Sequence, residues 1–170
     1  MIKAIVAVDS KWGIGRNNDL LFHLPEDMKF FRQTTQGKTV VMGSNTLLSF
    51  PNGKPLPNRR NIVLWPNAPK RDDCEIVESL EELKLLLSSI NEDVYVIGGA
   101  MFYRTMLAYC SEVLVTKVQA DGNAEVFFEN LDDKKEWECI SSSEPIETGG
   151  YTIIFTTYKN KDVQLLRGVK

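Results

Sequence analysis

Short, nearly continuous apolar runs alternate with amphipathic stretches along most of the chain. The runs are four to seven residues long and rich in β-branched residues, which predicts strands buried on both faces. They are Ile2–Val8, Thr39–Met42, Asn61–Leu64, Val94–Ile97 and Val113–Val118. The stretches between them predict helices at Pro25–Thr35, Ser44–Ser49, Leu80–Ile90 and Ala100–Ala108, the third opened by the capping-box pair Ser79 and Glu82. This alternation predicts one α/β domain with a largely parallel sheet and helices on its faces.

The last third of the chain differs, because no helix-like stretch separates its apolar runs. Lys135–Ser141 and Tyr151–Tyr158 predict two strands, joined by a turn that contains one proline and two glycines. Strands joined directly predict an antiparallel pair at one edge of the sheet. We expect the folded domain to span residues 1–159, and residues 160–170 to form a loosely held, polar and basic tail.

Composition narrows the classes of function. With 170 residues, 43% hydrophobic and 25% charged, the chain is long enough for one well-buried core. Its net charge of −3 gives no basic field that would attract nucleic acid or an anionic membrane. Three widely spaced cysteines and a single histidine argue against a disulfide framework and against a metal site. We expect a cytoplasmic protein without a signal peptide or membrane span, and nothing in the sequence demands more than a monomer.

Asp27 is a carboxylate placed where a helix is expected to bury hydrocarbon. A proline two residues earlier suits the first turn of that helix. Phe30 and Phe31 then follow Asp27 by three and four residues and cover the neighbouring surface, and Leu24 and Met28 add to the same apolar side. Two interpretations are open: the acid complements the positive end of the helix dipole, or it faces a ligand from an apolar wall.

Two strand-to-helix junctions contain glycine. Gly98 and Gly99 open the helix at Ala100, and Gly43 precedes Ser44 in the same way. Glycine lets the backbone approach a ligand closely, and a helix start offers free N–H groups to an anion. Each junction alone is also ordinary turn chemistry, and neither has a dinucleotide fingerprint or a Walker loop. Together they indicate a ligand with phosphates at the carboxyl ends of the strands.

The segment Asp9–Leu21 is a long loop directly after the first strand, with glycine or asparagine at four positions, Asn18 among them. Loops of this length in small domains are often lids over a site. The alternative is a solvated connection. Trp12 and Ile14 favour the lid, because apolar side chains need something to pack against.

A series of motifs, taken in sequence order, resembles one family. The motifs are Ile5-Val6-Ala7, Ile14-Gly15, Leu24-Pro25-Glu26-Asp27 with Phe31, Val41-Met42-Gly43 with Thr46, Pro55–Asn61 with Arg59, Val96-Ile97-Gly98-Gly99 with Tyr103, and the strand carrying Thr116. The chain resembles dihydrofolate reductase of the bacterial chromosomal type over nearly its whole length. The resemblance implies a central eight-stranded sheet, mostly parallel with an antiparallel C-terminal edge, and about four helices.

The resemblance also implies site residues. Asp27 would accept hydrogen bonds from the pterin with support from Thr116, and Arg59 would bind the glutamate-tail carboxylate. The implied catalytic residues are Asp27 and Phe22. The implied substrate-binding residues are Ile5, Val6, Asp27, Met28, Phe31, Phe50, Leu56, Arg59, Ile97 and Thr116. The implied cofactor-binding residues are Ala7, Ile14, Gly15, Gly43, Ser44, Asn45, Thr46, Leu64, Trp65, Gly98, Gly99, Ala100, Met101, Phe102 and Tyr103.

The implied reaction is hydride transfer from NADPH to C6 of 7,8-dihydrofolate, with a proton delivered to N5, in tetrahydrofolate biosynthesis and one-carbon metabolism. Such an enzyme would also be an antifolate target. Burial among aromatic residues should raise the pKa of Asp27. The ionised carboxylate then favours the protonated pterin, and a water admitted by the loop Asp9–Leu21 is the better candidate for the immediate proton donor.

Several residues on the cofactor side depart from the family pattern. The family often has arginine where this chain has Ser44 and Met101, and serine or arginine where it has Trp65. A phosphate monoester needs charged or multiple donors, so the sequence leaves the preference for NADPH over NADH open. Lys70 or Arg71 could supply the missing charge from the next loop.

Two more departures concern the loop and the pterin pocket. Phe22 replaces a tryptophan that is common in the family, and so lacks the indole N–H. Ala124–Phe128 replaces a Gly-Asp segment that interacts with the loop after the first strand, which predicts altered loop closure.

Two other functions compete with an active reductase. A related reductase domain of riboflavin synthesis shares the sheet and the dinucleotide turns, but lacks the Leu-Pro-x-Asp helix start. A binding or structural module with the same fold and weak cofactor use would explain Ser44, Trp65 and Met101. Four residues argue against the module, because a structural role needs no carboxylate in an apolar pocket: Asp27, Phe31, Arg59 and Thr116.

Overall fold

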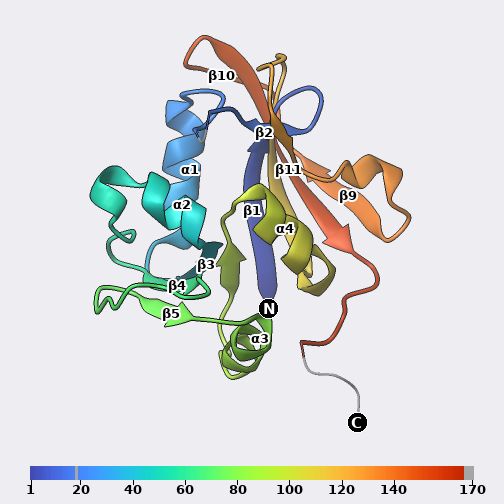
Figure 1. Ribbon diagram of the computed structural model, residues 1–170. Coiled ribbons are helices and arrows are strands. Elements are labelled where there is room, and N and C mark those ends of the chain that lie inside the picture. The colour runs from blue at the N-terminus through green and yellow to red at the C-terminus, as the bar shows by residue number, and fades with distance from the viewer. Residues whose placement is uncertain (18, 167–170) are drawn as a thin grey trace.

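The computed structural model describes residues 1–17 and 19–166, and a mixed sheet runs through its centre (Figure 1). Asn18 of the predicted loop and residues 167–170 of the predicted tail lie outside the described residues. Six parallel strands form most of the sheet: β1 (Ile2–Val8), β3 (Thr39–Gly43), β4 (Arg60–Leu64), β5 (Glu75–Val77), β6 (Val94–Val96) and β7 (Glu112–Val118). Their order is β7-β1-β6-β3-β4-β5. The carboxyl ends of these strands therefore meet at one edge.

Three antiparallel strands complete the sheet beyond β7. They are β9 (Trp137–Ser142), β10 (Ile146–Thr148) and β11 (Tyr151–Asn160). β11 pairs with β7 on one side. On its other side it pairs first with β10 and then with β9, so these two short strands share one position in the sheet. The sheet therefore has eight positions, which confirms the expected architecture of a mostly parallel sheet with an antiparallel C-terminal edge.

Four α-helices pack on the two faces of the sheet: α1 (Pro25–Thr35), α2 (Ser44–Ser49), α3 (Leu80–Ser88) and α4 (Ala100–Met106). Single-turn helices η1 (Pro51–Gly53), η2 (Leu107–Tyr109) and η3 (Leu131–Asp133) lie in the connections. The predicted capping box at α3 is present, since the Ser79 hydroxyl accepts from the Glu82 backbone N–H at 3.1 Å. α3 and α4 each end two residues before the predicted boundary.

The strands alternate between two apolar clusters, as buried strands with a period of two must. Val41, Ile62 and Val96 belong to the cluster that contains residues of α3 and α4. Val40, Met42, Val63 and Tyr95 belong to the second cluster, to which Phe31 of α1 and Leu47 of α2 also contribute. Ile5 of β1 lies in this second cluster and its neighbour Val6 lies in the first. The face covered by α1 and α2 is therefore the one that Ile5 and Asp27 share.

Four short strands were absent from the sequence prediction. β5 and β10 are three residues long, and the pair β2 (Gly13–Gly15) and β8 (Val126–Phe127) forms a small second sheet. They were missed because runs this short carry no readable periodicity. The predicted turn before β11 is in fact a hairpin in which Gly149 and Gly150 both have positive φ, at 58° and 86°.

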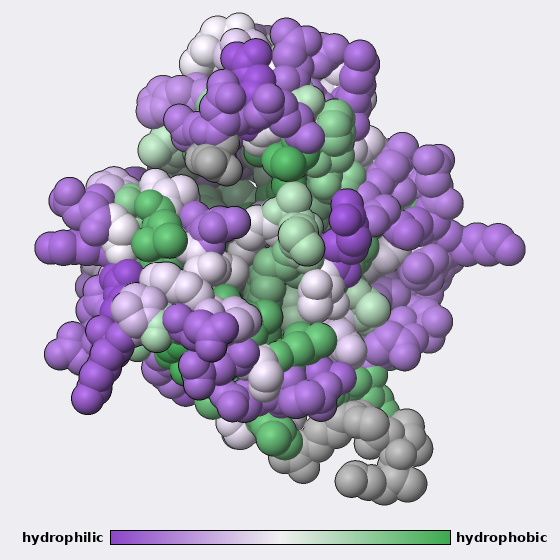
Figure 2. Space-filling view, viewed as in Figure 1, coloured by the Kyte–Doolittle hydropathy of each residue, from purple (hydrophilic) through white to green (hydrophobic). Residues whose placement is uncertain are grey.

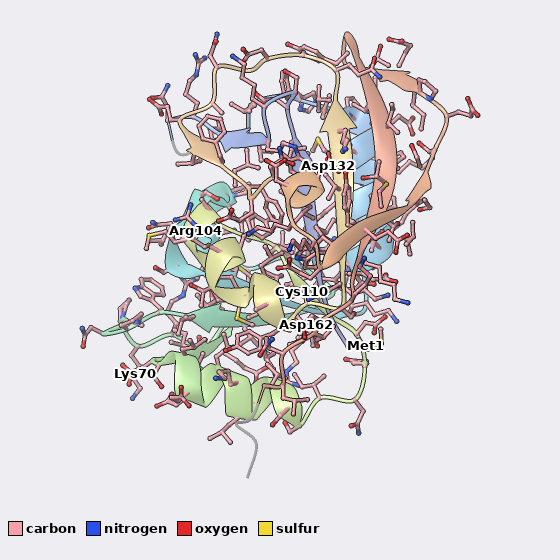
Figure 3. All side chains as sticks on the ribbon, turned by 90° about the vertical axis from the view of Figure 1, so that its right-hand side faces the viewer. Met1, Lys70, Arg104, Cys110, Asp132 and Asp162 are labelled. Atoms are coloured by element: carbon pink, nitrogen blue, oxygen red, sulfur yellow. The ribbon has the colours of Figure 1, made fainter. Side chains whose placement is uncertain are left out.

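The last strand extends slightly beyond its predicted end. β11 continues to Asn160, whose side chain is buried and donates to the Cys110 carbonyl at 2.9 Å. The Gln164 backbone N–H donates to the Ala108 carbonyl at 2.9 Å. In Figure 3 Cys110 and Asp162 are labelled close together. Among the described residues, no helix is long and apolar enough to cross a membrane.

Candidate functional site

Asp27 lies in the first turn of α1 and contacts the sheet through Thr116. The Thr116 hydroxyl donates to Asp27 Oδ1 at 2.6 Å, and Thr116 itself is only 1% exposed on β7. Burial raises the pKa of the Asp27 carboxyl, and the hydrogen bond from Thr116 offsets part of this rise. Within the described residues, Asp27 Oδ2 has no hydrogen-bond partner. One carboxylate oxygen is thus fixed, and the other is left to accept from a ligand.

Apolar side chains gather on the same face of the sheet as Asp27. One cluster contains the predicted pocket residues Ile5, Phe31, Phe50, Leu56 and Ile97. Met28, also predicted as part of the wall, is 50% exposed, and its substrate contact stays a prediction. Leu24 packs elsewhere, with Val118 and Ile153, and Val6 faces the opposite side of the sheet. In Figure 2, largely apolar surface lies in the recess between the polar top of the molecule and the helices at its left.

Arg59 is held by α1 and by its own loop. Its Nε donates to the Thr35 hydroxyl at 2.8 Å and its Nη1 donates to the Pro57 carbonyl at 2.8 Å. The guanidinium carbon lies 5.9 Å from the centroid of the Phe31 ring. Burial lowers the pKa of Arg59, and the nearby Arg32 charge lowers it further. Arginine keeps its charge in proteins, so a fixed cation stands beside an aromatic ring of the apolar cluster.

The two glycine junctions meet because β3 and β6 are neighbours in the sheet. The Gly43 N–H donates to the Gly98 carbonyl at 2.9 Å. A Cβ on Gly98 would lie 3.2 Å from the Thr46 hydroxyl oxygen, and one on Gly99 would lie 3.5 Å from it. Gly98 also has φ +131°, which side chains rarely adopt. The junctions therefore form one cradle of backbone and a single hydroxyl at the carboxyl ends of the strands, where dinucleotides bind in α/β sheets.

The remaining predicted cofactor residues divide into core and surface. Phe102 and Tyr103 are buried in α4, and the Tyr103 hydroxyl donates to the Ile5 carbonyl at 2.7 Å. Tyr103 thus ties the cradle to the strand that lines the apolar pocket. Trp65 is half-buried and packs in the cluster of Ile5, whereas Met101 is 79% exposed. The other predicted residues lie at the ends of strands β1 and β4 or at the starts of helices α2 and α4: Ala7, Ser44, Asn45, Leu64 and Ala100.

The two cations proposed as substitutes near the cofactor differ in their contacts. Arg71 Nη2 donates to Asp73 Oδ2 at 2.7 Å and to the Gly53 carbonyl at 2.8 Å. The Asp73 carboxylate therefore neutralises Arg71, and the hydrogen bond between them is the main cause that raises the pKa of Arg71. Lys70, labelled in Figure 3, is exposed and has no ion pair in the part of the chain that the structure describes. Of the two, only Lys70 keeps its charge available.

The loop after β1 is fastened by Asp9, a residue that the sequence interpretation did not single out. Asp9 is 3% exposed, and its Oδ1 accepts from the backbone N–H groups of Lys11 at 2.9 Å and Gly13 at 2.7 Å. Its Oδ2 accepts from the Gly122 N–H at 2.9 Å. An aspartate that begins a glycine-rich loop commonly forms such turns. That position in the sequence was the available signal.

The segment Ala124–Phe128 pairs with this loop, although it departs from the family pattern. β2 and β8 are antiparallel neighbours, and the Glu125 N–H donates to the Gly15 carbonyl at 2.8 Å. The Glu125 side chain accepts from the Asn17 N–H at 2.8 Å. Glu125 therefore supplies a carboxylate contact to the loop. Ile14 lies between the two glycines of β2, so its position depends on the pairing of β2 with β8.

Phe22 packs against the cluster of Leu24, Val118 and Ile153. Its ring contacts Tyr151 edge to face, with centroids 4.6 Å apart. A Cβ on Gly122 would lie 3.0 Å from Phe22 Cζ, so the loop that holds Asp9 also closes over this ring. A catalytic part for Phe22 stays a prediction. His23 is exposed, and no group of three or more metal-ligating side chains exists within residues 1–17 and 19–166.

A glycine cradle at the carboxyl ends of parallel strands, beside a half-buried carboxylate, is the arrangement of an α/β enzyme that binds a dinucleotide and a polar heterocycle. Comparison with known proteins narrows this class. The family model for dihydrofolate reductase matches residues 1–160. The chain therefore belongs to the dihydrofolate reductase family.

Individual relatives agree with this assignment. The chain is 35% identical over 166 residues to the dihydrofolate reductase of Bacillus subtilis (strain 168), which covers 95% of this chain and 96% of that protein. It is 34% identical over 164 residues to that of Neisseria gonorrhoeae, covering 94% and 98%. A solved structure of the Enterococcus faecalis dihydrofolate reductase, complexed with NADP(H) and RAB-propyl, matches with a TM-score of 0.83 at 28% identity, covering 95% and 97% of the two chains.

Proposed function

We propose that this protein reduces 7,8-dihydrofolate to tetrahydrofolate with NADPH as the hydride donor. The observation that carries the proposal is the Asp27 carboxylate, fixed on one oxygen by Thr116 and bordered by apolar side chains. The carboxylate, with Oδ2 free, would accept hydrogen bonds from the ring nitrogen and exocyclic amine of a pterin. Family membership narrows the activity to this reduction and leaves the riboflavin-pathway alternative without support.

The residues of the glycine cradle fit a dinucleotide. Gly98 and Gly99 leave open the space beside the Thr46 hydroxyl that a side chain would fill, and the Gly43 backbone lies directly against them. When bound, the nicotinamide ring would supply the hydride. The chain's own contribution would be to hold the two rings face to face, with Ala7 of β1 and Ile14 of the loop on the nicotinamide side.

Asp27 has two tasks in this proposal. It orients the pterin through hydrogen bonds, and its charge stabilises positive charge that develops when N5 is protonated. Because burial raises the pKa of Asp27, the carboxylate favours a protonated partner more than an exposed aspartate would. It does not need to reach N5 itself, because a water at the edge of the loop can deliver the proton.

Arg59 would bind the glutamate tail of the substrate. Two of its donors are engaged by Thr35 and Pro57, which fixes the plane of the guanidinium. The Nη2 group has no partner within the described residues. A planar guanidinium held in this way suits a carboxylate.

The preference between NADPH and NADH is part of the proposal. The related Enterococcus faecalis enzyme was solved with NADP(H), which favours NADPH here. Ser44 and Met101 add no charge at the cradle, and Asp73 neutralises Arg71. We therefore expect a smaller discrimination against NADH than arginines at these positions would give, with Lys70 as the remaining cation near the end of β4.

The test is direct. The purified protein is mixed with dihydrofolate and NADPH, and separately with dihydrofolate and NADH, and absorbance of the reduced nicotinamide is followed. Consumption of NADPH with formation of tetrahydrofolate is expected. If neither cofactor is consumed, the binding or structural module replaces the enzyme as the best interpretation.

The setting of the enzyme is also proposed. A net charge of −3 supports a protein without a nucleic-acid partner. Three free cysteines, two of them buried or half-buried, suit a reducing cytoplasm. We expect a monomer whose folded domain ends near residue 159, and gel filtration with mass measurement would check the oligomeric state.

A further inference from the structure

Trp12 is the one residue of the loop after β1 that is large, aromatic and buried. Its exposed fraction is 8%, while Lys11 and Arg16 nearby are exposed. Its backbone lies in the left-handed region at φ +63°, which is unfavourable for a bulky residue. A conformation of this kind persists only when surrounding contacts hold it. The contacts of the indole are therefore the feature to explain.

Four side chains form the receptor for this indole: Phe128, Tyr158, Lys117 and Asp132. The Phe128 ring stacks at 6.3 Å between centroids, and the Tyr158 ring meets the indole edge-on at 5.8 Å. Lys117 Nζ lies 5.2 Å from the centroid of Trp12 and 5.1 Å from that of Tyr158. Stacked rings and a cation over their faces attract the indole beyond simple burial.

Asp132 fixes two other members of the receptor, Tyr158 and Lys117. The Tyr158 hydroxyl donates to Asp132 Oδ1 at 2.7 Å, and Lys117 Nζ lies 3.5 Å from Asp132 Oδ2. Burial raises the pKa of Tyr158, and the Asp132 carboxylate raises it further, so the hydroxyl stays protonated and donates. Asp132 is labelled in Figure 3, on η3 in front of the sheet. The receptor is thus made by η3, β7 and β11, and only Phe128 comes from the segment that pairs with the loop.

The receptor is joined to the site through the backbone. The Phe128 N–H donates to the Trp12 carbonyl at 2.8 Å, directly beside the β2–β8 pair. Gly13 follows Trp12, and Ile14 comes next; in the proposed function Ile14 lies on the nicotinamide side of the cradle. A shift of the indole would therefore move β2 and Ile14, whereas Asp27 and Thr116 belong to α1 and β7 and would stay.

We propose that Trp12 is a positioning residue for the reduction: the receptor holds its indole, and the indole holds Ile14 over the nicotinamide side of the cradle. The inference rests on the proposed function and deepens it. It makes the hydride-transfer step depend on the indole while equilibrium binding of dihydrofolate at Asp27 does not. Asp9 fixes the first turn of the loop, and Trp12 fixes its approach to β8.

The experiment compares Trp12→Leu with the conservative Trp12→Phe and with Trp137→Leu. Trp137 is the matched control, because it is also buried, at 6% exposed, and no ring contact joins it to Trp12 within the described residues. The first measurement is tryptic cleavage of the native protein after Arg16, which is exposed in the loop. The second is the single-turnover rate of hydride transfer, with the Kd for dihydrofolate measured separately.

For Trp12→Leu we expect cleavage after Arg16 to be at least about tenfold faster, because loop opening controls cleavage. Hydride transfer should be at least about tenfold slower, because misplacement of a reacting ring is costly, and the dihydrofolate Kd should stay within about twofold. Trp12→Phe should keep most of the wild-type resistance to cleavage and most of the wild-type rate of hydride transfer. Trp137→Leu should lower the urea midpoint without changing either one.

The proposal would be overturned if Trp12→Leu were cleaved after Arg16 and transferred hydride at the wild-type rates. It would also be overturned if Trp137→Leu changed both rates as much as Trp12→Leu does. Should Trp12→Leu fail to fold, Tyr158→Phe takes its place, with an expected two- to threefold rise in cleavage from the lost contact to Asp132. An unchanged rate there overturns the proposal as well. Cleavage needs no turnover, so an inactive wild-type protein would refute the proposed function and with it the part that Trp12 plays in hydride transfer, while the cleavage data would still show whether the indole anchors the loop.

Discussion

The two halves of the candidate site are built from different parts of the chain. The substrate half consists of side chains with fixed partners, Asp27 on Thr116 and Arg59 on Thr35. The cofactor half consists mainly of backbone, with the glycines of two junctions around one hydroxyl. Substrate binding therefore depends on single side chains. Cofactor binding depends instead on space beside the glycines that no side chain fills. The two halves should respond differently to substitution.

Asp27→Asn tests the substrate half most severely. The amide keeps the size of the side chain but removes the charge that favours a protonated pterin. Turnover at neutral pH should fall about 100-fold or more, within the range of a lost acid–base group, while NADPH binding should be unchanged. Steady-state kinetics and titration with NADPH measure the two quantities. Wild-type turnover in this variant would contradict the assignment of Asp27.

Gly98→Ala tests the cofactor half. The new methyl group would meet the Thr46 hydroxyl at 3.2 Å, on a backbone with φ +131°. We expect a loss of stability of about 1–3 kcal/mol, the scale of a strained backbone position, and weaker NADPH binding. Calorimetry and urea unfolding measure both effects. The control is Gly37→Ala, also at positive φ but with open space around it; it should lose stability without losing affinity for NADPH.

Arg59→Lys separates the tail of the substrate from its ring. Lysine keeps the charge but loses the planar guanidinium held by Thr35 and Pro57. The KM for dihydrofolate should rise about tenfold, which corresponds to roughly 1.4 kcal/mol. A dihydropterin without a glutamate tail should show no such rise. An equal rise in KM with both substrates would mean that Arg59 supports the structure of the pocket and does not bind the glutamate tail.

The smallest expected effect concerns stability and pH. Because burial raises the pKa of Asp27, the folded state holds this proton more tightly than the unfolded state. The stabilisation is complete below the unfolded pKa and is lost as the pH rises through the folded pKa. Asp27→Asn should therefore be more stable than the wild type at pH 7, by on the order of 1 kcal/mol. Urea unfolding at several pH values should show the difference shrinking as the solution becomes more acidic.

The fold was largely predictable because buried parallel strands have a distinctive pattern. Ile2–Val8, Pro25–Thr35 and Ser44–Ser49 have the predicted bounds. The missed elements, such as β5 and β8, are two or three residues long and exist only because another strand lies beside them. Their pairing is a tertiary property, which no local pattern records.

The site was predictable where a residue type implies its chemistry. An acid beside two phenylalanines was enough to single out Asp27. The exposure of Met28 and the packing of Leu24 with Val118 and Ile153 were not predictable, because both depend on how the chain around the start of α1 is oriented against the sheet. Asp9 was overlooked, although its position at the start of a glycine-containing loop was a signal for its turn contacts with Lys11 and Gly13. What the sequence could not show was its third partner, the Gly122 N–H, which lies more than a hundred residues away.

Helix α1 begins at a proline and has no capping side chain of its own at Leu24. The cap comes from the hairpin near the other end of the chain, where the Thr148 hydroxyl accepts from the Glu26 N–H at 3.0 Å. Gly149 lies so close to the His23 carbonyl that a side chain there has no room. During synthesis, the start of α1 is therefore made 122 residues before the Thr148 hydroxyl that caps it. A chain released early from the ribosome would carry every pocket residue named above and still lack a firmly seated pocket.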